Sequence, residues 1–321
     1  MFSKTYKNIF IIYSSIFIIS RITIYFFFDV EPTFVPRGQI LELYLLRENL
    51  LESLYFLHFQ PFLWNFIFGI LAKFYSSNET IYYISFIFNF IITLFIIYYV
   101  YKILTLFKFS DLTKHIILFF ILLNPNIIFY ENYVPHYAHL SLLIMFQVIY
   151  FLLMYFHTKR IKYEFYCYLG ILILSFIWVL FSFITLIFLF LIFRIYEKKF
   201  DYNSLLIFLI ILFISIIPNL KNKIVFNIFS AGSWTGIQLA MATNPTAECS
   251  IWQYSMSSDE KTNTKHKNLI QKEMEEYKIH FKRNIKGRAA VELNEANTNN
   301  VGIIYRSKRC LKSSIEYIKK N

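Results

Sequence analysis

Residues 80–101 read TIYYISFIFNFIITLFIIYYVY, an apolar and aromatic stretch without a single charged side chain. A helix needs about 20 such residues to cross the hydrocarbon core of a bilayer. Similar stretches occupy residues 8–28, 115–131, 136–157 and 164–193, and a shorter one occupies residues 204–218. The pattern predicts an all-α fold, a polytopic bundle of transmembrane helices.

The composition also indicates a membrane protein. Of the 321 residues, 57% are hydrophobic and only 16% are charged, whereas a typical soluble domain has about 25% charged residues. Because the charge deficit ends at Pro218, we expect a transmembrane domain over residues 1–218 and a polar, mostly helical C-terminal segment over residues 219–321. The net charge of +12 accompanies a general richness in Lys and Asn, so we expect no nucleic-acid partner.

The positions of Lys and Arg predict the orientation in the membrane. We take residues 164–193 as a hairpin of two short spans and residues 61–75 as a re-entrant or interfacial helix, which gives about seven spans. The cytoplasmic segments are then the N-terminus and the basic stretches 102–114, 158–163 and 194–203. Loop 29–79 and the tail lie on the other face. A single long helix over 164–193 would instead place the tail in the cytoplasm.

Two segments on the non-cytoplasmic side, loop 29–79 and the tail, contain predicted helices or cysteines. In loop 29–79, leucines from Leu41 to Leu57 recur near helical spacing, which predicts an amphipathic surface helix. The tail has a helical stretch over residues 269–286 and a second amphipathic one over residues 307–320. Cys249 and Cys310 are able to pair in an oxidising compartment, but three scattered cysteines define no metal site.

Asp29-Val30-Glu31 directly follows the first span. Two carboxylates at a membrane exit are suited to general-base catalysis or to holding a divalent cation. In the simpler alternative they only mark the water boundary of the helix. Arg21 lies within the same span, where a charge is costly and indicates a function or a buried partner. A lipid phosphate or the two carboxylates would suit it; the alternative is snorkelling to the interface.

Four further polar residues could face the same site. His58 and Gln60 precede Pro61, which suits the first turn of the helix that follows. Glu131 and His136 lie in the turn between the third and fourth spans. Each is otherwise an incidental polar group of a surface turn. No zinc, nucleophile-elbow, phosphate-loop or dinucleotide motif occurs in the sequence.

This order of features resembles the opening of the GT-C type glycosyltransferases, the superfamily of the protein O-mannosyltransferases and the lipid A aminoarabinose transferases. The resemblance rests on Asp29-Val30-Glu31 as the modified Asp-x-Asp motif and on Gln60-Pro61-Phe62 before a short helix. Residues 45–55 and 230–239 are similar to an uncharacterised branch of these enzymes. Phe62 replaces the second proline usual in the motif. These enzymes usually have more than about seven spans, which leaves open that the chain is a fragment of a longer one.

The resemblance implies transfer of a sugar from a polyprenyl- or dolichyl-phosphate carrier to an acceptor on the non-cytoplasmic face, with inversion. Asp29 would be the base, and Glu31 would assist it or bind a divalent cation. The residues that would meet the substrate or the lipid phosphate are Arg21, His58, Gln60, Glu131 and His136. The membrane would be that of the endoplasmic reticulum in a eukaryote, or the inner or plasma membrane in a bacterium.

A different class of function is also open: a non-catalytic multi-pass protein, either a transporter or an assembly subunit. A transporter places paired polar residues near the middle of the bilayer. Here the spans are almost purely apolar apart from Arg21. The sequence therefore favours an enzyme that works on lipid substrates at one surface.

Overall fold

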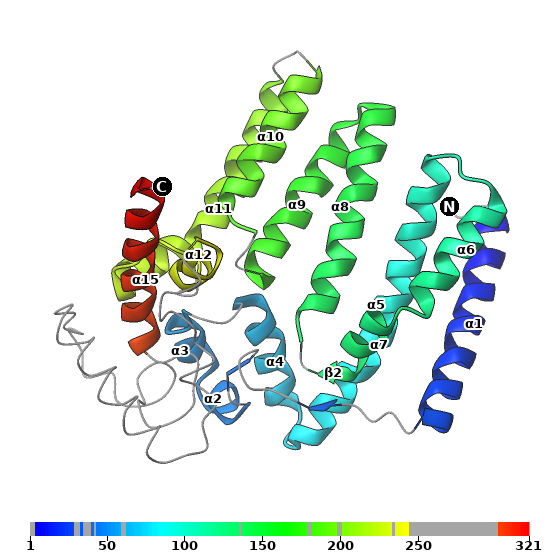
Figure 1. Cartoon of the computed structure of the whole chain (residues 1–321), viewed down its shortest axis with the longest axis horizontal. Coiled ribbons are helices and arrows are strands. Elements are labelled where there is room, and N and C mark those ends of the chain that lie inside the picture. Colours follow the sequence, from blue (N-terminus) through cyan, green and yellow to red (C-terminus); the bar gives the residue numbers. More distant parts are fainter. Residues whose placement is uncertain are drawn as a thin grey trace. The chain divides into compact units, whose positions relative to one another are not determined.

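A computed structural model describes residues 4–28, 33–34, 40–41, 43–58, 62–134, 136–178, 181–197, 201–232, 235–243 and 301–320. These residues are almost entirely helical, which confirms the all-α prediction (Figure 1). The chain divides into two compact units, which are described separately. Unit 1 comprises residues 1–36 and 77–214, and unit 2 comprises residues 37–76 and 215–321.

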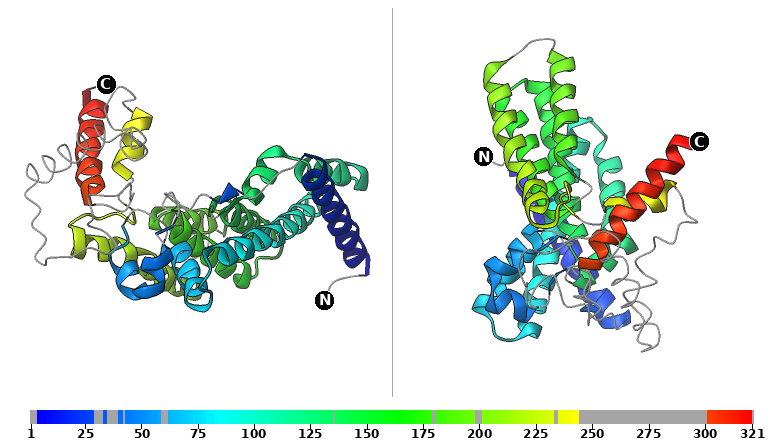
Figure 2. Two further views of the ribbon diagram at one scale, coloured as in Figure 1. Left: turned by 90° about the horizontal axis from the view of Figure 1, so that it is seen from below. Right: turned by 90° about the vertical axis from the view of Figure 1, so that its left-hand side faces the viewer.

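Unit 1 is a bundle of long helices around an aromatic and aliphatic core. Its elements are α1 (Lys4–Phe28), β1 (Thr33–Phe34), α5 (Asn78–Leu106), α6 (Asp111–Leu122), α7 (Pro125–Asn132), β2 (Tyr133–Val134), α8 (Ala138–Thr158), α9 (Ile161–Ile177), α10 (Phe183–Glu197) and the first half of α11 (Tyr202–Phe226). Helix α8 packs against both α5 and α9, and α10 packs against α9, as two further views show (Figure 2). Tyr13, Phe17, Ile96 and Leu118 belong to one buried cluster that joins α1, α5 and α6.

Among the described residues, four helices are long and apolar enough to cross a membrane: α1, α5, α8 and α11. The bent pair α6 and α7 makes a fifth if it counts as one span. Large apolar side chains on these helices point outward; Phe26 is 81% exposed. Exposed apolar surface of this extent suits contact with lipid rather than water. These long apolar helices are compatible with an integral multi-pass membrane protein.

The prediction of about seven spans is not confirmed. The stretch 164–193 breaks into two helices, as the predicted hairpin requires, but α9 has 17 residues and α10 has 15. Both are shorter than the roughly 20 residues that a perpendicular crossing needs. The two separate helices agree with the predicted hairpin. That each of them crosses the bilayer stays a prediction.

The predicted span 115–131 contains a break. Helix α6 ends at Leu122, and α7 starts at Pro125 with its axis turned by 45°. Pro125 has no N–H and clashes with the preceding turn, and the Asn124 side chain caps α7 by accepting from the N–H of Asn126 at 2.9 Å. The break leaves the last carbonyls of α6 without helical partners, and the site below uses one of them.

The predicted end of the last apolar stretch at Pro218 is wrong, because α11 continues to Phe226. A proline removes one helical hydrogen bond but need not end a helix that is held elsewhere. The true stop is Asn227, which takes a left-handed conformation with φ of 55°. The N–H of Ile228 then bonds back to the carbonyl of Asn222 at 3.3 Å, the usual geometry of a helix C-terminus.

Unit 2 contains shorter helices. They are α2 (Leu43–Glu48), α3 (Leu50–Tyr55), α4 (Phe62–Phe74), the end of α11, α12 (Thr235–Thr243) and α15 (Val301–Lys320). The amphipathic helix predicted in loop 29–79 is thus split in two at Asn49, whereas the short helix at 61–75 and the amphipathic one at 307–320 are confirmed. The predicted helix 269–286 and Cys249 lie outside the described residues, so the pairing of Cys249 with Cys310 stays a prediction.

Candidate polar site in unit 1

The predicted site residues fall into three groups. Asp29, Glu31 and Gln60 lie outside the described residues. Arg21, Glu131 and His136 belong to unit 1, and His58 belongs to unit 2.

Arg21 and Glu131 form a buried ion pair between α1 and the last turn of α7. The guanidinium Nε and Nη2 donate to the two carboxylate oxygens of Glu131 at 2.5 and 2.8 Å, a bidentate geometry that is among the strongest for this pair. Arg21 is 3% exposed and Glu131 is fully buried. The charge predicted to need a partner inside the first span therefore has a protein carboxylate beside it.

The remaining donors of Arg21 are mostly used within the protein. Its Nη1 donates to the carbonyl of Leu122 at 3.0 Å and to the hydroxyl of Ser20 at 3.4 Å. The Leu122 carbonyl is available because α6 ends there, and a cation is favoured at that negative end of a helix. Of the five N–H groups on a guanidinium, the second one on Nη2 has no partner among the described residues.

Three polar residues that the sequence analysis overlooked complete the network. Thr93 of α5 donates its hydroxyl to Glu131 Oε1 at 2.8 Å, and the Asn89 side-chain amide donates to the backbone carbonyl of Glu131 at 3.2 Å. His139 Nε2 lies 2.8 Å from the Thr93 oxygen. Because the threonine proton points to the carboxylate, His139 must carry its proton on Nε2 and donate to Thr93.

A signal for two of them was present in the sequence. Asn89 and Thr93 interrupt the apolar stretch 80–101 at positions four residues apart, and residues with that spacing share one face of a helix. Polar groups aligned in this way within a span indicate a buried polar neighbour. His139 had no comparable signal.

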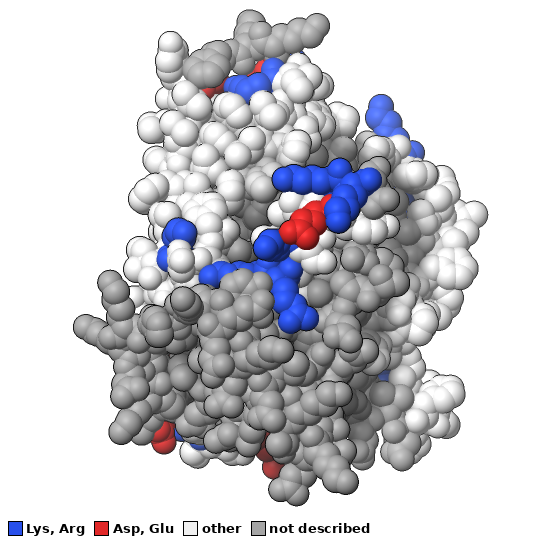
Figure 3. Space-filling view, turned by 60° about the vertical axis from the view of Figure 1, so that its left-hand side comes forward, with Lys and Arg blue, Asp and Glu red and all other residues white. Residues whose placement is uncertain are grey.

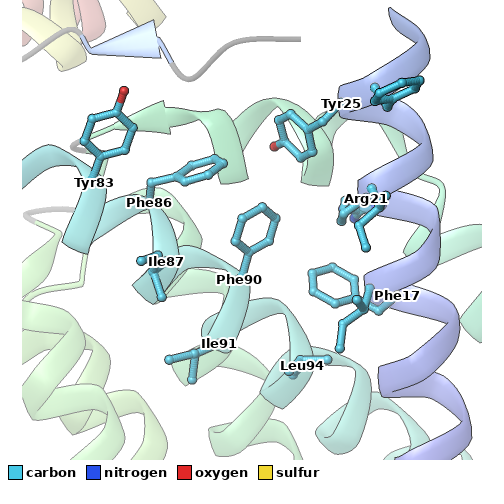
Figure 4. Close-up of a pocket in the computed structure, with 12 residues that line it drawn as sticks. Phe17, Arg21, Tyr25, Tyr83, Phe86, Ile87, Phe90, Ile91 and Leu94 are labelled. Atoms are coloured by element: carbon cyan, nitrogen blue, oxygen red, sulfur yellow. The ribbon is translucent and has the colours of Figure 1, made fainter. Parts of the chain in front are cut away.

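An apolar groove of about 760 Å³ runs between α1 and α5 directly beside the ion pair (Figure 4). Aromatic and aliphatic side chains line it, and Arg21 and Tyr25 place polar atoms in its wall. Tyr25 donates its hydroxyl to the side chain of Asn132. Along α1 the groove reaches Phe26, three residues before Asp29. The groove has the size and chemistry for a hydrocarbon chain.

The same turn holds the chain on both sides of Asp29-Val30-Glu31. Before the motif, Arg21 is clamped to Glu131. After it, β1 pairs in parallel with β2, with Thr33 opposite Tyr133 and Phe34 opposite Val134. The described flanks of the acidic motif are thus both fixed to residues 131–134.

His136 forms part of the structure of this turn. Its ring lies 5.1 to 5.2 Å from the rings of Tyr130, Tyr133 and Tyr137. Its Nδ1 accepts a hydrogen bond from the N–H of Ala138, at the start of α8, at 3.0 Å. Burial lowers the pKa of His136 to about 4, so the ring is neutral at neutral pH and able to accept this bond.

Acidification is expected to destabilise the protein through His136. Its pKa is about 4 when folded and about 6.5 when unfolded, so its contribution is complete above pH 6.5 and is lost as the pH falls toward 4. The loss is at most about 3 kcal/mol. The melting temperature of the purified protein should fall over that range. His136→Asn should flatten the fall, whereas His157→Asn, at an exposed position, should leave it unchanged; equal slopes in all three proteins would contradict this role.

His58 lies at a different place, in unit 2. It is 1% exposed, and its ring packs edge-on against Phe226 at 4.8 Å. The carbonyl of the preceding Leu57 accepts a hydrogen bond from the ammonium of Lys221. These contacts fix the segment before α4 to the end of α11.

A second buried polar cluster was also missed. Glu164 of α9 accepts from the guanidinium of Arg194 at 2.6 Å and from the hydroxyl of Tyr168 at 2.7 Å. Arg194 also donates to Ser204 of α11 at 2.8 Å. Arg194 lies in the basic stretch 194–203, which is predicted to be cytoplasmic, and nothing local in the sequence pairs it with Glu164.

Among the described residues, no group of three or more His, Cys, Asp or Glu side chains is placed to hold a metal ion. The predicted cation ligands Asp29 and Glu31 lie outside that part of the chain. Comparisons with protein-family models, with curated proteins and with solved structures found no match to this chain.

Proposed function

We propose that this protein is a membrane glycosyltransferase that moves a sugar from a polyprenyl- or dolichyl-phosphate carrier to an acceptor on the non-cytoplasmic face. The observation that carries the proposal is the groove between α1 and α5, which follows α1 to within three residues of Asp29. A carrier chain in this groove would bring its phosphate-sugar end toward the acidic motif. The resemblance of that motif to the GT-C enzymes supports the same reading.

In the proposed reaction, Asp29 takes the proton of the acceptor hydroxyl. The hydroxyl oxygen attacks the anomeric carbon, the bond from that carbon to the phosphate oxygen breaks, and polyprenyl phosphate leaves with inversion at the sugar. Glu31 orients the acceptor; alternatively, Asp29 and Glu31 would together hold a divalent cation, which would supply positive charge for the leaving phosphate. The N–H that remains on Arg21 Nη2 is a donor for that phosphate.

The groove offers a matched pair of variants that tests the proposal. Ile22 lines the groove and is 62% exposed, whereas Ile19, on the same helix, is 63% exposed and does not line it. Ile22→Trp should obstruct the carrier chain and lower sugar transfer by about tenfold, as expected from the cost of overfilling a packed site. Ile19→Trp should leave it unchanged. Transfer from polyprenyl-phosphate-linked sugar is measured in membranes at matched expression, and equal rates in the two variants would exclude this groove as the carrier site.

The ion pair favours one alternative. Four of the five guanidinium N–H groups of Arg21 are taken by the protein itself, which suits a structural clamp in a non-catalytic membrane protein or assembly subunit. Under that alternative both tryptophan variants lack transfer activity, as does the wild type.

A further inference from the structure

Helix α15 has an apolar face that is covered over only part of its length. Ser307, Cys310 and Ser314 are buried, and Ser307 accepts a hydrogen bond from the N–H of Gly236 in α12 at 3.0 Å. A Cβ atom at Gly236 would lie 2.0 Å from the carbonyl oxygen of Ser307, so the two helices are in close contact there. Beyond Ser314 the face continues into exposed residues: Ile315 is 41% exposed and Ile318 is 53% exposed.

A row of lysines borders this exposed end. Lys308, Lys312 and Lys319 are spaced by four and seven residues and therefore align along one side of the helix, next to the row of Leu311, Ile315 and Ile318. Lys312 and Lys319 are exposed, and Lys308 is half-buried. Figure 3 shows Lys and Arg side chains grouped on one face, with acidic side-chain atoms in the middle of the group.

The start of this row lies beside the end of a candidate membrane span. Burial lowers the pKa of Lys308, and the positive charge of Lys223, in the last turn of α11, lowers it further. Among the described residues no carboxylate forms an ion pair with either ammonium group. Two neighbouring cations without a carboxylate between them favour an anion from outside the protein.

We propose that the C-terminal half of α15 lies in the bilayer surface at the end of α11 and binds the anionic headgroups of phospholipids. Lys308 and Lys312 contact the headgroup phosphates, and Ile315 and Ile318 enter the boundary with the acyl chains.

The combination of charge and apolar surface selects a membrane as the partner. A nucleic acid or an acidic protein would match the lysines but would not require the isoleucines beside them. An interfacial helix needs both, with apolar residues facing the acyl chains and Lys at the headgroup level. Because α11 is itself long and apolar enough to cross a membrane, its end already places Lys223, and Lys308 beside it, near a bilayer surface.

The test uses the full chain in lipid nanodiscs and measures hydrogen exchange over residues 301–320. Replacing part of the zwitterionic phospholipid with an anionic one should slow exchange in this segment by about tenfold, since polybasic segments are attracted to anionic surfaces. Equal exchange in the two lipid compositions would overturn the proposal. The same slowing by inorganic phosphate in zwitterionic discs would also overturn it, because the anion would then not need to be a lipid.

Variants separate the two parts of the surface. Lys308→Gln with Lys312→Gln should abolish the effect of anionic lipid, whereas the charge-matched control Lys73→Gln with Lys162→Gln, both at exposed positions, should retain it. Ile315→Ser with Ile318→Ser should weaken the effect of anionic lipid, both in the wild type and in the control with Lys73→Gln and Lys162→Gln. Unchanged exchange in α4, which belongs to the same unit as α15, verifies that each variant is folded. A full lipid effect in the Lys308 and Lys312 variant would contradict the assignment, and none of these results depends on glycosyltransferase activity.

Discussion

Asp29→Asn is expected to lower sugar transfer by about 10²–10⁴-fold, the usual contribution of a general base. The amide cannot take the proton of the acceptor hydroxyl at neutral pH. Glu31 is the only other carboxylate in the motif. The loss should appear in kcat, because in the proposed function the groove, and not Asp29, would hold the carrier chain. The measurement is transfer from polyprenyl-phosphate-linked sugar in membranes that contain equal amounts of each protein.

Glu31→Gln distinguishes the two roles of the acidic motif. If Glu31 only orients the acceptor, its loss should cost less than that of Asp29. If the two carboxylates hold a cation together, the losses should be similar and a chelator should inhibit the wild type. An Asp29→Asn protein that transfers sugar at the wild-type rate would contradict the assignment of Asp29 as the base.

Removing one member of the buried ion pair is expected to destabilise the protein by about 3–5 kcal/mol, since the other charge is left buried without a partner. Arg21→Leu strands the carboxylate of Glu131, which is fully buried, and Glu131→Leu strands the guanidinium. Both changes should lower the free energy of unfolding of the protein in detergent, which is measured by chemical denaturation. Membrane insertion should persist, because a leucine in the first span favours it.

The double variant Arg21→Leu with Glu131→Leu should recover part of this loss, because no charge is then buried alone. The pair of Lys114 and Asp111 supplies a control, as the Asp111 side chain is 83% exposed. Asp111→Asn should leave the stability nearly unchanged, because an ion pair at the surface contributes little. Additive losses in the double variant would show that Arg21 and Glu131 do not depend on each other.

The helices could largely be predicted from the sequence because each apolar stretch is long and contains at most one charged side chain. The limits of the prediction lie where local chemistry and packing compete. Asn124-Pro125 is visible as a cap followed by a proline, yet the 45° bend depends on the packing around it. At Pro218 the expected helix end is wrong, because α11 continues through the proline to Phe226 and Asn227 ends it instead.

The site was predictable one residue at a time but not as an assembly. Arg21 had to have a partner, because a lone charge inside a span is costly. That the partner is Glu131, 110 residues away, follows only from the meeting of α1 and α7. Asn89 and Thr93 were visible as aligned polar groups, whereas His139 joins through Thr93 and depends on the packing of α8 against α5.

The most direct test of the proposed function is turnover by the wild-type protein. Membranes that contain it are incubated with a panel of polyprenyl- and dolichyl-phosphate-linked sugars, and the release of lipid phosphate and the transfer of sugar are measured against membranes without it. We predict transfer from at least one such donor, with inversion at the anomeric carbon and a loss of about 10²–10⁴-fold in Asp29→Asn. Absence of turnover on every donor, by a protein that is folded and inserted, would contradict the account and favour a non-catalytic membrane protein.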